Sequence, residues 1–159
     1  MALAESRLLI SWTMGLTVKI SCDDQKAILE RLNRSSHGTL METLGIEYVD
    51  VGEEHLSARM PVSAKVHQPM GILHGGATAA LAESVGSAAS ALLLNLNTHY
   101  PVGLELSINH LRAMKSGHVV GCARLIHGGR STHLWDIRIT DEDGQLIAVS
   151  RLTMMILTR

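Results

Sequence analysis

The segment 67-HQPMGILHGGATAALAESVGSAAS-90 decides how this chain folds. Beyond its first few residues it consists almost wholly of Gly, Ala, Ser, Leu and Val, yet it carries one glutamate, Glu83, near its middle. From near His74 to near Asn95 or Asn97 the residues are apolar on nearly every side of a helix, which is typical of a central buried helix. An ionised carboxylate loses its hydration in such a place. That loss is costly unless a partner or a function compensates for it, so Glu83 needs an explanation.

The sequence on both sides of this helix alternates between apolar and polar residues, as strands do. Before the helix, "IEYVDV" and "HLSARMPV" are joined by "GEE" in the manner of a hairpin. After it come four more alternating stretches: "VGLELSINHLRAM", "HVVGCARLIH", "THLWDIRITD" and "QLIAVSRLTMMIL". Asp143-Gly144 between the last two is a strong turn signal. The sequence therefore predicts an α+β fold in which an antiparallel β-sheet wraps around one long central α-helix.

The N-terminal part of the chain has weaker patterns. "SCDDQKAILERLN" predicts a short helix with Ser21 as its N-cap, and "TLMETLG" predicts one more helical turn. We divide the chain into an N-terminal extension with a short helix, residues 1–38, and a main domain, residues 39–159. The run "RLLISWTMGLTV" begins with Arg7 before apolar residues, but Glu5 precedes it and no A-x-A-like site follows, so we expect no signal peptide.

Composition excludes several classes of partner. The 159 residues, 17.2 kDa, suit one domain. The chain has 14 Lys plus Arg against 15 Asp plus Glu, a net charge of -1, so no overall basic field would hold a nucleic acid. The longest nearly apolar run, residues 85–94, is half of what a membrane span needs. We therefore expect no nucleic acid, no membrane and a cytoplasmic location.

The cysteines and histidines show no metal-binding spacing. Cys22 and Cys122 are too few and too far apart for a disulfide framework, which favours a reducing compartment. The nine histidines form no H-x-x-x-H pair. We predict no metal.

The opening segment also carries chemistry. Residues three, four and seven apart share a helix face, so Glu83, Ser87 and Ser90 form a polar stripe. "HGG" stands at the start of the helix, where free backbone N–H groups and the positive dipole end favour developing negative charge. Gly75 lies roughly 12 Å from Glu83 along the helix axis, at about 1.5 Å of rise per residue. A substrate touching both groups is more easily arranged if a second subunit supplies one of them.

At this point the sequence resembles a known family. "HQPMGILHGGATAALAESVGS", followed by "VGLELSINHLRA", "RLIHGGRS" and "SRLTMMIL", resembles the hotdog-fold acyl-CoA thioesterases of the 4-hydroxybenzoyl-CoA thioesterase and phenylacetate-pathway type. Within that family it is most similar to the enzymes that hydrolyse 1,4-dihydroxy-2-naphthoyl-CoA and to the proofreading thioesterases of enterobactin synthesis. The likeness covers about residues 40 to 157.

The resemblance implies a set of catalytic roles. Glu83 matches the carboxylate that acts as nucleophile or as general base on water. The Gly75 N–H matches the donor that polarises the thioester carbonyl. Gln68 and His74 match side chains that assist or orient the acyl group, and Ser87 matches the hydroxyl that places the water or the carboxylate. The family's site lies between subunits, with Glu83 and Ser87 from one and Gln68 and Gly75 from the other.

The resemblance also implies a substrate and an assembly. The substrate is an acyl- or aroyl-CoA, coenzyme A being part of it, and no cofactor is needed. The assembly is a homo-oligomer, a dimer with shared active sites and then a dimer of dimers. Positions near the coenzyme A phosphates correspond to His110, Arg112, Arg130 and Ser131. This chain departs from its relatives at Met70, where many have Phe, and at Ala91, where some carry a bulky residue; both positions bear on the acyl pocket.

Several alternatives remain open at the level of sequence. Glu83 could form a buried ion pair, for example with Arg112, and His74 could serve only as a helix cap. Gln68 could satisfy loop backbone groups. The enzyme could be a hydratase or dehydratase on acyl thioesters, or the chain could be a non-catalytic acyl-CoA binding module.

Overall fold

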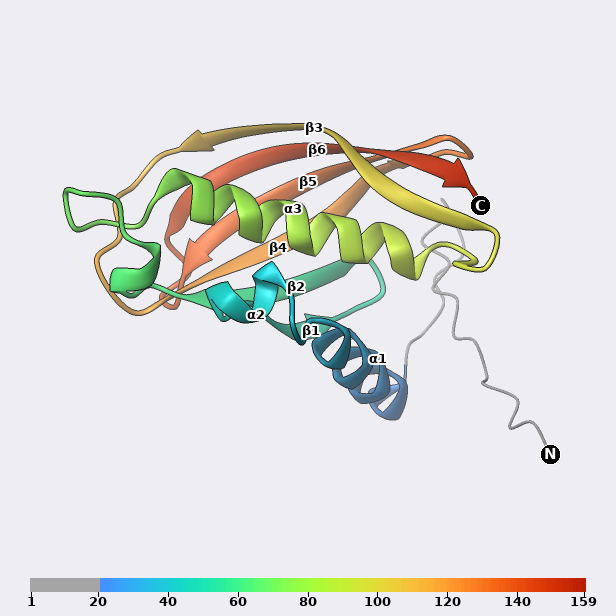
Figure 1. Cartoon of the computed structure of the whole chain (residues 1–159), viewed down its shortest axis with the longest axis horizontal. Helices are drawn as coiled ribbons and strands as arrows, with labels where there is room; N and C mark the ends of the chain where they lie inside the picture. The colour runs from blue at the N-terminus through green and yellow to red at the C-terminus, as the bar shows by residue number, and fades with distance from the viewer. Residues whose placement is uncertain (1–20) are drawn as a thin grey trace.

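The computed structural model describes residues 21–159 and shows one curved sheet with a long helix across it (Figure 1). The run that begins with Arg7 lies outside the described residues. The helices are α1 (Cys22–Ser35), α2 (Leu40–Leu44), the 3-10 turn η1 (Ala64–Val66) and α3 (Gly75–Leu92). The strands are β1 (Glu47–Val51), β2 (His55–Pro61), β3 (His99–His110), β4 (His118–Gly128), β5 (Thr132–Asp141) and β6 (Leu146–Thr158).

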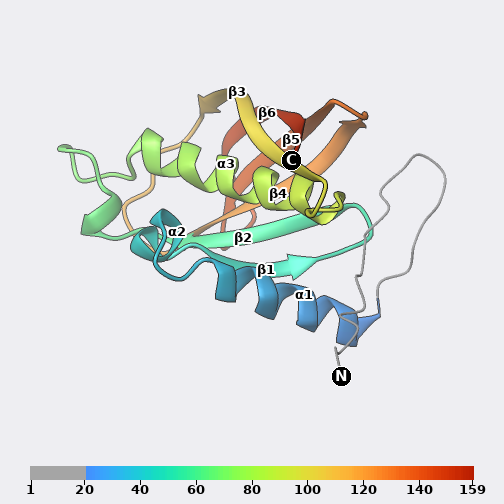
Figure 2. The same ribbon diagram turned by 45° about the vertical axis from the view of Figure 1, so that its right-hand side comes forward.

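The six strands form a single antiparallel sheet in the order β1-β2-β4-β5-β6-β3. Helix α3 lies across the concave face of this sheet, and both views of the ribbon show the sheet curling around it (Figures 1 and 2). The predicted α+β architecture, an antiparallel sheet around one long helix, is confirmed.

The core lies between α3 and the inner face of the sheet. Every second residue of β5 points inward and is buried: His133, Trp135, Ile137 and Ile139. The Trp135 indole N–H donates to the Ser90 hydroxyl on α3 at 2.7 Å. Ser90 therefore serves packing between helix and sheet and does not continue the polar stripe of Glu83 and Ser87.

Helix α3 begins where the sequence predicts and ends earlier. Its N-cap is His74, but its last residue is Leu92 and not Asn95 or Asn97. The Asn95 side chain accepts a hydrogen bond from the Asn97 N–H at 3.2 Å, and the Asn95 carbonyl accepts one from the Thr98 N–H at 2.9 Å. These local bonds form a turn that competes with further helix.

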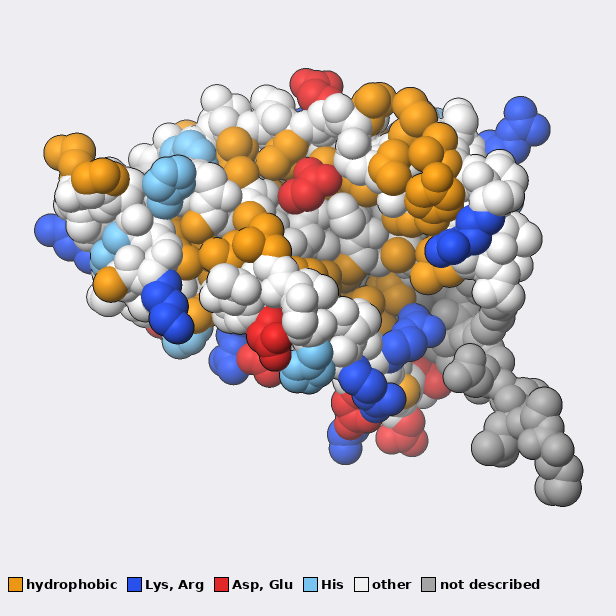
Figure 3. All heavy atoms as spheres, in the orientation of Figure 1, with side chains coloured by type: hydrophobic (Ala, Val, Ile, Leu, Met, Phe, Trp, Pro, Cys, Tyr) orange, Lys and Arg blue, Asp and Glu red, His pale blue; other side chains and the backbone are white. Residues whose placement is uncertain are grey.

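The helix is buried on one face only within a single chain. Thr78, Leu81, Ala82, Val85, Gly86, Ala89, Ser90 and Leu92 are buried, whereas Gly76 is exposed and the remaining helix residues are half-buried. Burial on nearly every side, as the sequence predicts, is not reached in one subunit. Apolar side chains gather over α3 and β3 on the face drawn in Figure 3.

The two edges of the sheet differ. Helix α1 lies along the β1 edge, with Ile28 and Leu32 in the core cluster. The Asn33 side chain accepts from the Tyr48 N–H at 2.8 Å and donates to the Tyr48 carbonyl at 2.9 Å, so it occupies both backbone groups of that edge residue. At the other edge, β3 pairs only with β6 among the described strands. An edge with free backbone groups is a template for pairing with another chain.

The remaining predicted elements are confirmed, with small shifts of their ends. Ser21 caps α1 by accepting from the Asp24 N–H at 3.2 Å. Gly144 adopts a φ of +78° in the turn between β5 and β6. The division of the chain at residue 38 stays a prediction. Within residues 21–159, no helix is long and apolar enough to cross a membrane.

Candidate active site

The start of α3 presents one free backbone donor. The His74 carbonyl accepts hydrogen bonds from the Ala77 and Thr78 N–H groups, and the His74 ring nitrogen Nδ1 accepts one from the Gly76 N–H at 2.8 Å. The Gly75 N–H has no acceptor among the described residues. The predicted carbonyl-polarising donor is therefore available at the positive end of the helix. His74 itself is the N-cap, and a direct catalytic role for it stays a prediction.

His110 lies against Gly75. A β-carbon built on Gly75 would come within 2.8 Å of His110 Nε2 and within 3.3 Å of two ring carbons. The ring of His110, at the end of β3, therefore covers the α-carbon beside the free N–H. Sequence patterns do not predict this contact, because the two residues are 35 positions apart, and the resemblance assigns His110 to the coenzyme A phosphates. The structure brings it to the proposed carbonyl site.

Glu83 has no charged partner in the described part of the chain. Its side chain is half-buried, and neither Arg112 nor any other Lys or Arg of residues 21–159 forms an ion pair with it. Burial alone raises the pKa of the Glu83 carboxyl above its ordinary value of 4.5. The alternative of a buried ion pair therefore finds no partner among residues 21–159 of the same chain. A carboxylate held this way is a better base than one in water.

Ser87 lies one helical turn beyond Glu83, and Ala91 lies one turn further. The Ser87 hydroxyl contacts the sulfur of Met154 at 3.7 Å, a weak acceptor that leaves the hydroxyl available to a ligand. Ser87 and Ala91 are both half-buried. The structure therefore keeps Glu83, Ser87 and Ala91 on one accessible stripe of α3.

Gln68 and Met70 lie in the loop between η1 and α3, which projects from the molecule in Figure 1. The Gln68 side-chain oxygen accepts from the Met70 N–H at 2.5 Å, and the Gln68 carbonyl accepts from the Gly71 N–H at 2.9 Å. Gln68 thus closes the loop, as one alternative proposed. Met70 is 83% exposed.

The four predicted phosphate contacts do not lie together in one subunit. His110 pairs with Ala148 on β6, whereas the Ser131 carbonyl accepts from the Ile156 N–H at 2.9 Å. Eight residues of β6 separate these points, roughly 26 Å at about 3.3 Å per residue. Arg112 lies at the His110 end and Arg130 at the Ser131 end, both exposed. Within one chain these residues lie apart, and their joining in one binding site stays a prediction.

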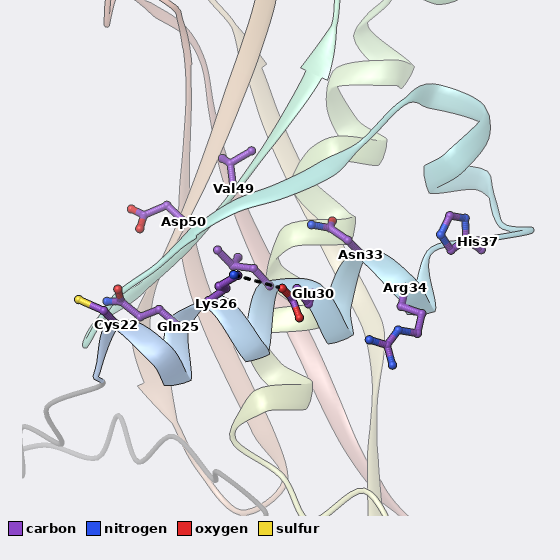
Figure 4. Close-up of a pocket in the computed structure, with 10 residues that line it drawn as sticks. Cys22, Gln25, Lys26, Glu30, Asn33, Arg34, His37, Val49 and Asp50 are labelled. Carbon is purple, nitrogen blue, oxygen red and sulfur yellow. Dashed lines mark ion pairs between the residues drawn. The ribbon is translucent and has the colours of Figure 1, made fainter.

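A surface hollow of about 720 Å³ lies elsewhere, between α1 and β1 (Figure 4). Its walls carry exposed polar side chains, including a Lys26–Glu30 ion pair at 4.0 Å. It contains none of the predicted site residues and lies at the opposite sheet edge from β3, about five strand spacings away. We assign no role in the chemistry to it.

Among residues 21–159, no group of three or more His, Cys, Asp or Glu side chains could hold a metal ion. Both cysteines are free thiols. The arrangement instead offers a helix-start N–H for a developing oxyanion and a half-buried carboxylate on the same helix.

Comparison with known proteins identifies relatives of this chain in sequence and in fold. Residues 70–148 match the thioesterase superfamily. A proofreading thioesterase of Cronobacter turicensis is 46% identical over 129 residues, which are 81% of this chain and 93% of that protein. The 1,4-dihydroxy-2-naphthoyl-CoA hydrolase of Escherichia coli is 41% identical over 133 residues, 84% of this chain and 97% of that protein. The crystal structure of a mutant thioesterase from Pseudomonas aeruginosa superposes with a TM-score of 0.81 at 46% identity, covering 82% of this chain and 94% of that one.

Proposed function

The chain belongs to the thioesterase superfamily and is a thioester hydrolase, and we propose that its substrate is an acyl- or aroyl-CoA, which it cleaves to free coenzyme A and a carboxylate. One relative has a coenzyme A thioester in its name. The observation that carries the proposal is Glu83, a half-buried carboxylate with no ion-pair partner among the described residues, on the helix whose first N–H is free.

In the proposed reaction, the thioester oxygen accepts a hydrogen bond from the Gly75 N–H. Glu83 either removes a proton from water, whose oxygen then attacks the carbonyl carbon, or attacks that carbon itself to form an anhydride that water opens. The tetrahedral intermediate collapses with cleavage of the C–S bond, and the coenzyme A thiolate takes up a proton. The Gly75 N–H stabilises the oxyanion in either route. Turnover in ¹⁸O-labelled water distinguishes the routes, because only the nucleophilic one can place label in the Glu83 carboxylate.

The proposed site is shared between two subunits. Within one chain, Glu83 lies roughly 12 Å along α3 from Gly75. The contacts of the two groups on β3 are also separated, because Glu83 touches Gly103 and Gly75 touches His110. Strand β3 is an open edge, so a second copy can pair with it antiparallel about a two-fold axis. A two-fold axis at Ser107 sets this residue opposite its own copy and sets His110 opposite the partner's Leu104, the extra residue beside Gly103. Glu83 then approaches the partner's Gly75.

The same register also gathers the phosphate-binding candidates. It sets Arg112 opposite the partner's Val102. Val102 pairs with Met155, which pairs with Thr132, the neighbour of Ser131. The gap between Arg112 and the partner's Ser131 becomes about three strand spacings, roughly 15 Å, in place of roughly 26 Å within one chain. One coenzyme A can then meet Arg112 from one subunit and Arg130 and Ser131 from the other. Neither arginine forms an ion pair with another described residue.

A subunit-mixing experiment tests the shared site. Glu83→Gln and Gln68→Ala are each expected to inactivate the homodimer. Co-expressed subunits form mixed dimers as half of all dimers, and each mixed dimer has one site with both residues intact, so activity recovers to about a quarter of wild type. If each site lies within one subunit, no mixture recovers activity.

A substrate panel tests the reaction itself. Thiol release is measured with benzoyl-, phenylacetyl-, hexanoyl- and lauroyl-CoA, and we expect release from at least one of them. The order of rates describes the acyl pocket to which Met70 and Ala91 contribute. Water addition to crotonyl-CoA without thiol release would favour a hydratase. Tight binding of every substrate without release would favour a binding module.

Assembly and compartment belong to the same proposal. Two dimers are expected to form a tetramer, which light scattering of the purified chain measures. The cytoplasm is the proposed compartment, because both cysteines are free thiols, as a reducing environment keeps them.

A further inference from the structure

Strand β3 carries a bulge beside Glu83. Gly103 pairs with Met154 on β6 and Glu105 pairs with Thr153, so Leu104 is an extra residue in β3. Leu104 is 57% exposed. Bulges bend a strand locally and often re-aim side chains near functional sites. This bulge places a glycine, and not a residue with a side chain, opposite the middle of α3.

Gly103 is in direct contact with the Glu83 carboxylate. A β-carbon built on Gly103 would overlap Glu83 Oε1 and would lie 3.1 Å from Glu83 Cδ and 3.5 Å from Oε2. All three of the nearest atoms belong to that one carboxylate. The carboxylate therefore occupies the space that any other residue at position 103 would fill.

We infer that Gly103 is a positioning residue for Glu83: the missing side chain at the β3 bulge is what lets the carboxylate sit between α3 and β3. The inference rests on the proposed function, in which Glu83 acts on the thioester. A methyl group at position 103 displaces the carboxylate from its half-buried position, because the two cannot occupy the same space. Gly103 supplies no group that takes part in the reaction and acts only through Glu83.

Gly103→Ala is expected to reduce kcat about 100-fold, because a displacement on the order of 1 Å at the reacting group costs about that much. KM should change less than threefold, since Glu83 is not needed to hold the coenzyme A part of the substrate. Burial raises the pKa of Glu83. A carboxylate pushed toward water loses part of that rise, so the acid limb of the kcat/KM profile moves to lower pH.

Gly121→Ala is a matched control. Gly121 lies on β4 and also faces α3, and its added β-carbon would lie 3.2 Å from Leu81 Cγ and 3.7 Å from Val85 Cγ1. It therefore introduces the same methyl group against the same helix without touching a carboxylate. Its kcat should stay within threefold of wild type and its acid limb should not move.

A stability measurement covers the case in which Gly103→Ala is too unstable for kinetics. The added methyl should lower the melting temperature by about 1 to 3 °C in the wild-type background, because it must push aside the flexible end of the Glu83 side chain. In the Glu83→Ala background the space is vacant, so Gly103→Ala should lower the melting temperature by less than 1 °C or raise it. Equal losses in both backgrounds would overturn the inference, as would a Gly103→Ala enzyme with wild-type kcat and acid limb. Glu83→Gln, assayed alongside, distinguishes failure of the proposed function from failure of the inference about Gly103. Full turnover in that variant refutes the proposed catalytic role of Glu83 and not only the role of Gly103.

Discussion

Replacing Glu83 by glutamine should make the folded protein more stable. Glu83 is half-buried, and no charged group in the described residues compensates for its lost hydration. Glutamine has nearly the same shape and no charge, so it removes that cost. A substitution that removes the cost of a functional residue in this way commonly adds about 0.5 to 2 kcal/mol to the free energy of unfolding. For a chain of this size that corresponds to roughly 1 to 8 °C in melting temperature.

The pH dependence of this gain identifies its cause. The folded pKa of Glu83 is raised above its unfolded value of 4.5. The folded state therefore holds the proton more tightly, and wild type loses stability as pH rises from the unfolded pKa through the folded one. The advantage of Glu83→Gln should be small at pH 5 and full at pH 8 in urea unfolding. Glu105→Gln makes the same chemical change at an exposed position of β3 and should show no such trend. A Glu83→Gln advantage that is equal at both pH values, or absent, would refute the reasoning.

Three further predictions concern the hydrogen bonds of Asn33 at the sheet edge, the carbonyl site at Gly75 and the buried His133. Asn33→Ala removes two hydrogen bonds to Tyr48 and should cost about 1 to 3 kcal/mol of unfolding free energy, whereas Arg31→Ala on the exposed face of α1 should cost under about 0.5; equal melting temperatures of the two variants would contradict this. Gly75→Ala should lower kcat about 100-fold with little loss of stability, because its methyl group meets only the exposed His110 ring and the incoming carbonyl, and unchanged kcat would count against the carbonyl site. His133 is buried, and desolvation first and the nearby His127 second lower its pKa below 6.5. The unfolded chain therefore binds more protons below pH 6.5, and urea midpoints of wild type should fall more between pH 7 and pH 5 than those of His133→Phe; parallel falls would exclude this contribution.

Sequence patterns predict most of this fold because its elements differ in period. The strands alternate with period two around one continuous small-residue helix, and both signals are local. The end of α3 is missed by three residues or more, since Asn95 stops the helix through its side chain and carbonyl, and propensity does not count those bonds. The hydrogen bonds by which Asn33 covers the β1 edge are not predicted either, because Asn33 and Tyr48 are 15 positions apart.

In the candidate site, too, relations within one helix are predicted and contacts between distant segments are not. Glu83, Gly75 and Ser87 lie on one helix, so spacing alone sets their relation. The contacts of Glu83 with Gly103 and of Gly75 with His110 depend on how β3 passes the helix, and a sequence does not fix that path. The separation of the phosphate-binding candidates within one subunit depends on strand pairing too, with Arg112 at the His110 end of β6 and Arg130 at the Ser131 end, and their shared role stays a prediction.

The measurement that tests the central claim most directly is kcat for thiol release by Glu83→Gln against wild type, on the best acyl-CoA of the panel, with the dissociation constant of that substrate measured for both. The account predicts that kcat falls by about 10² to 10⁴, the usual contribution of a general base, while the dissociation constant stays within about threefold. A Glu83→Gln enzyme that releases thiol within about threefold of the wild-type rate would contradict the account.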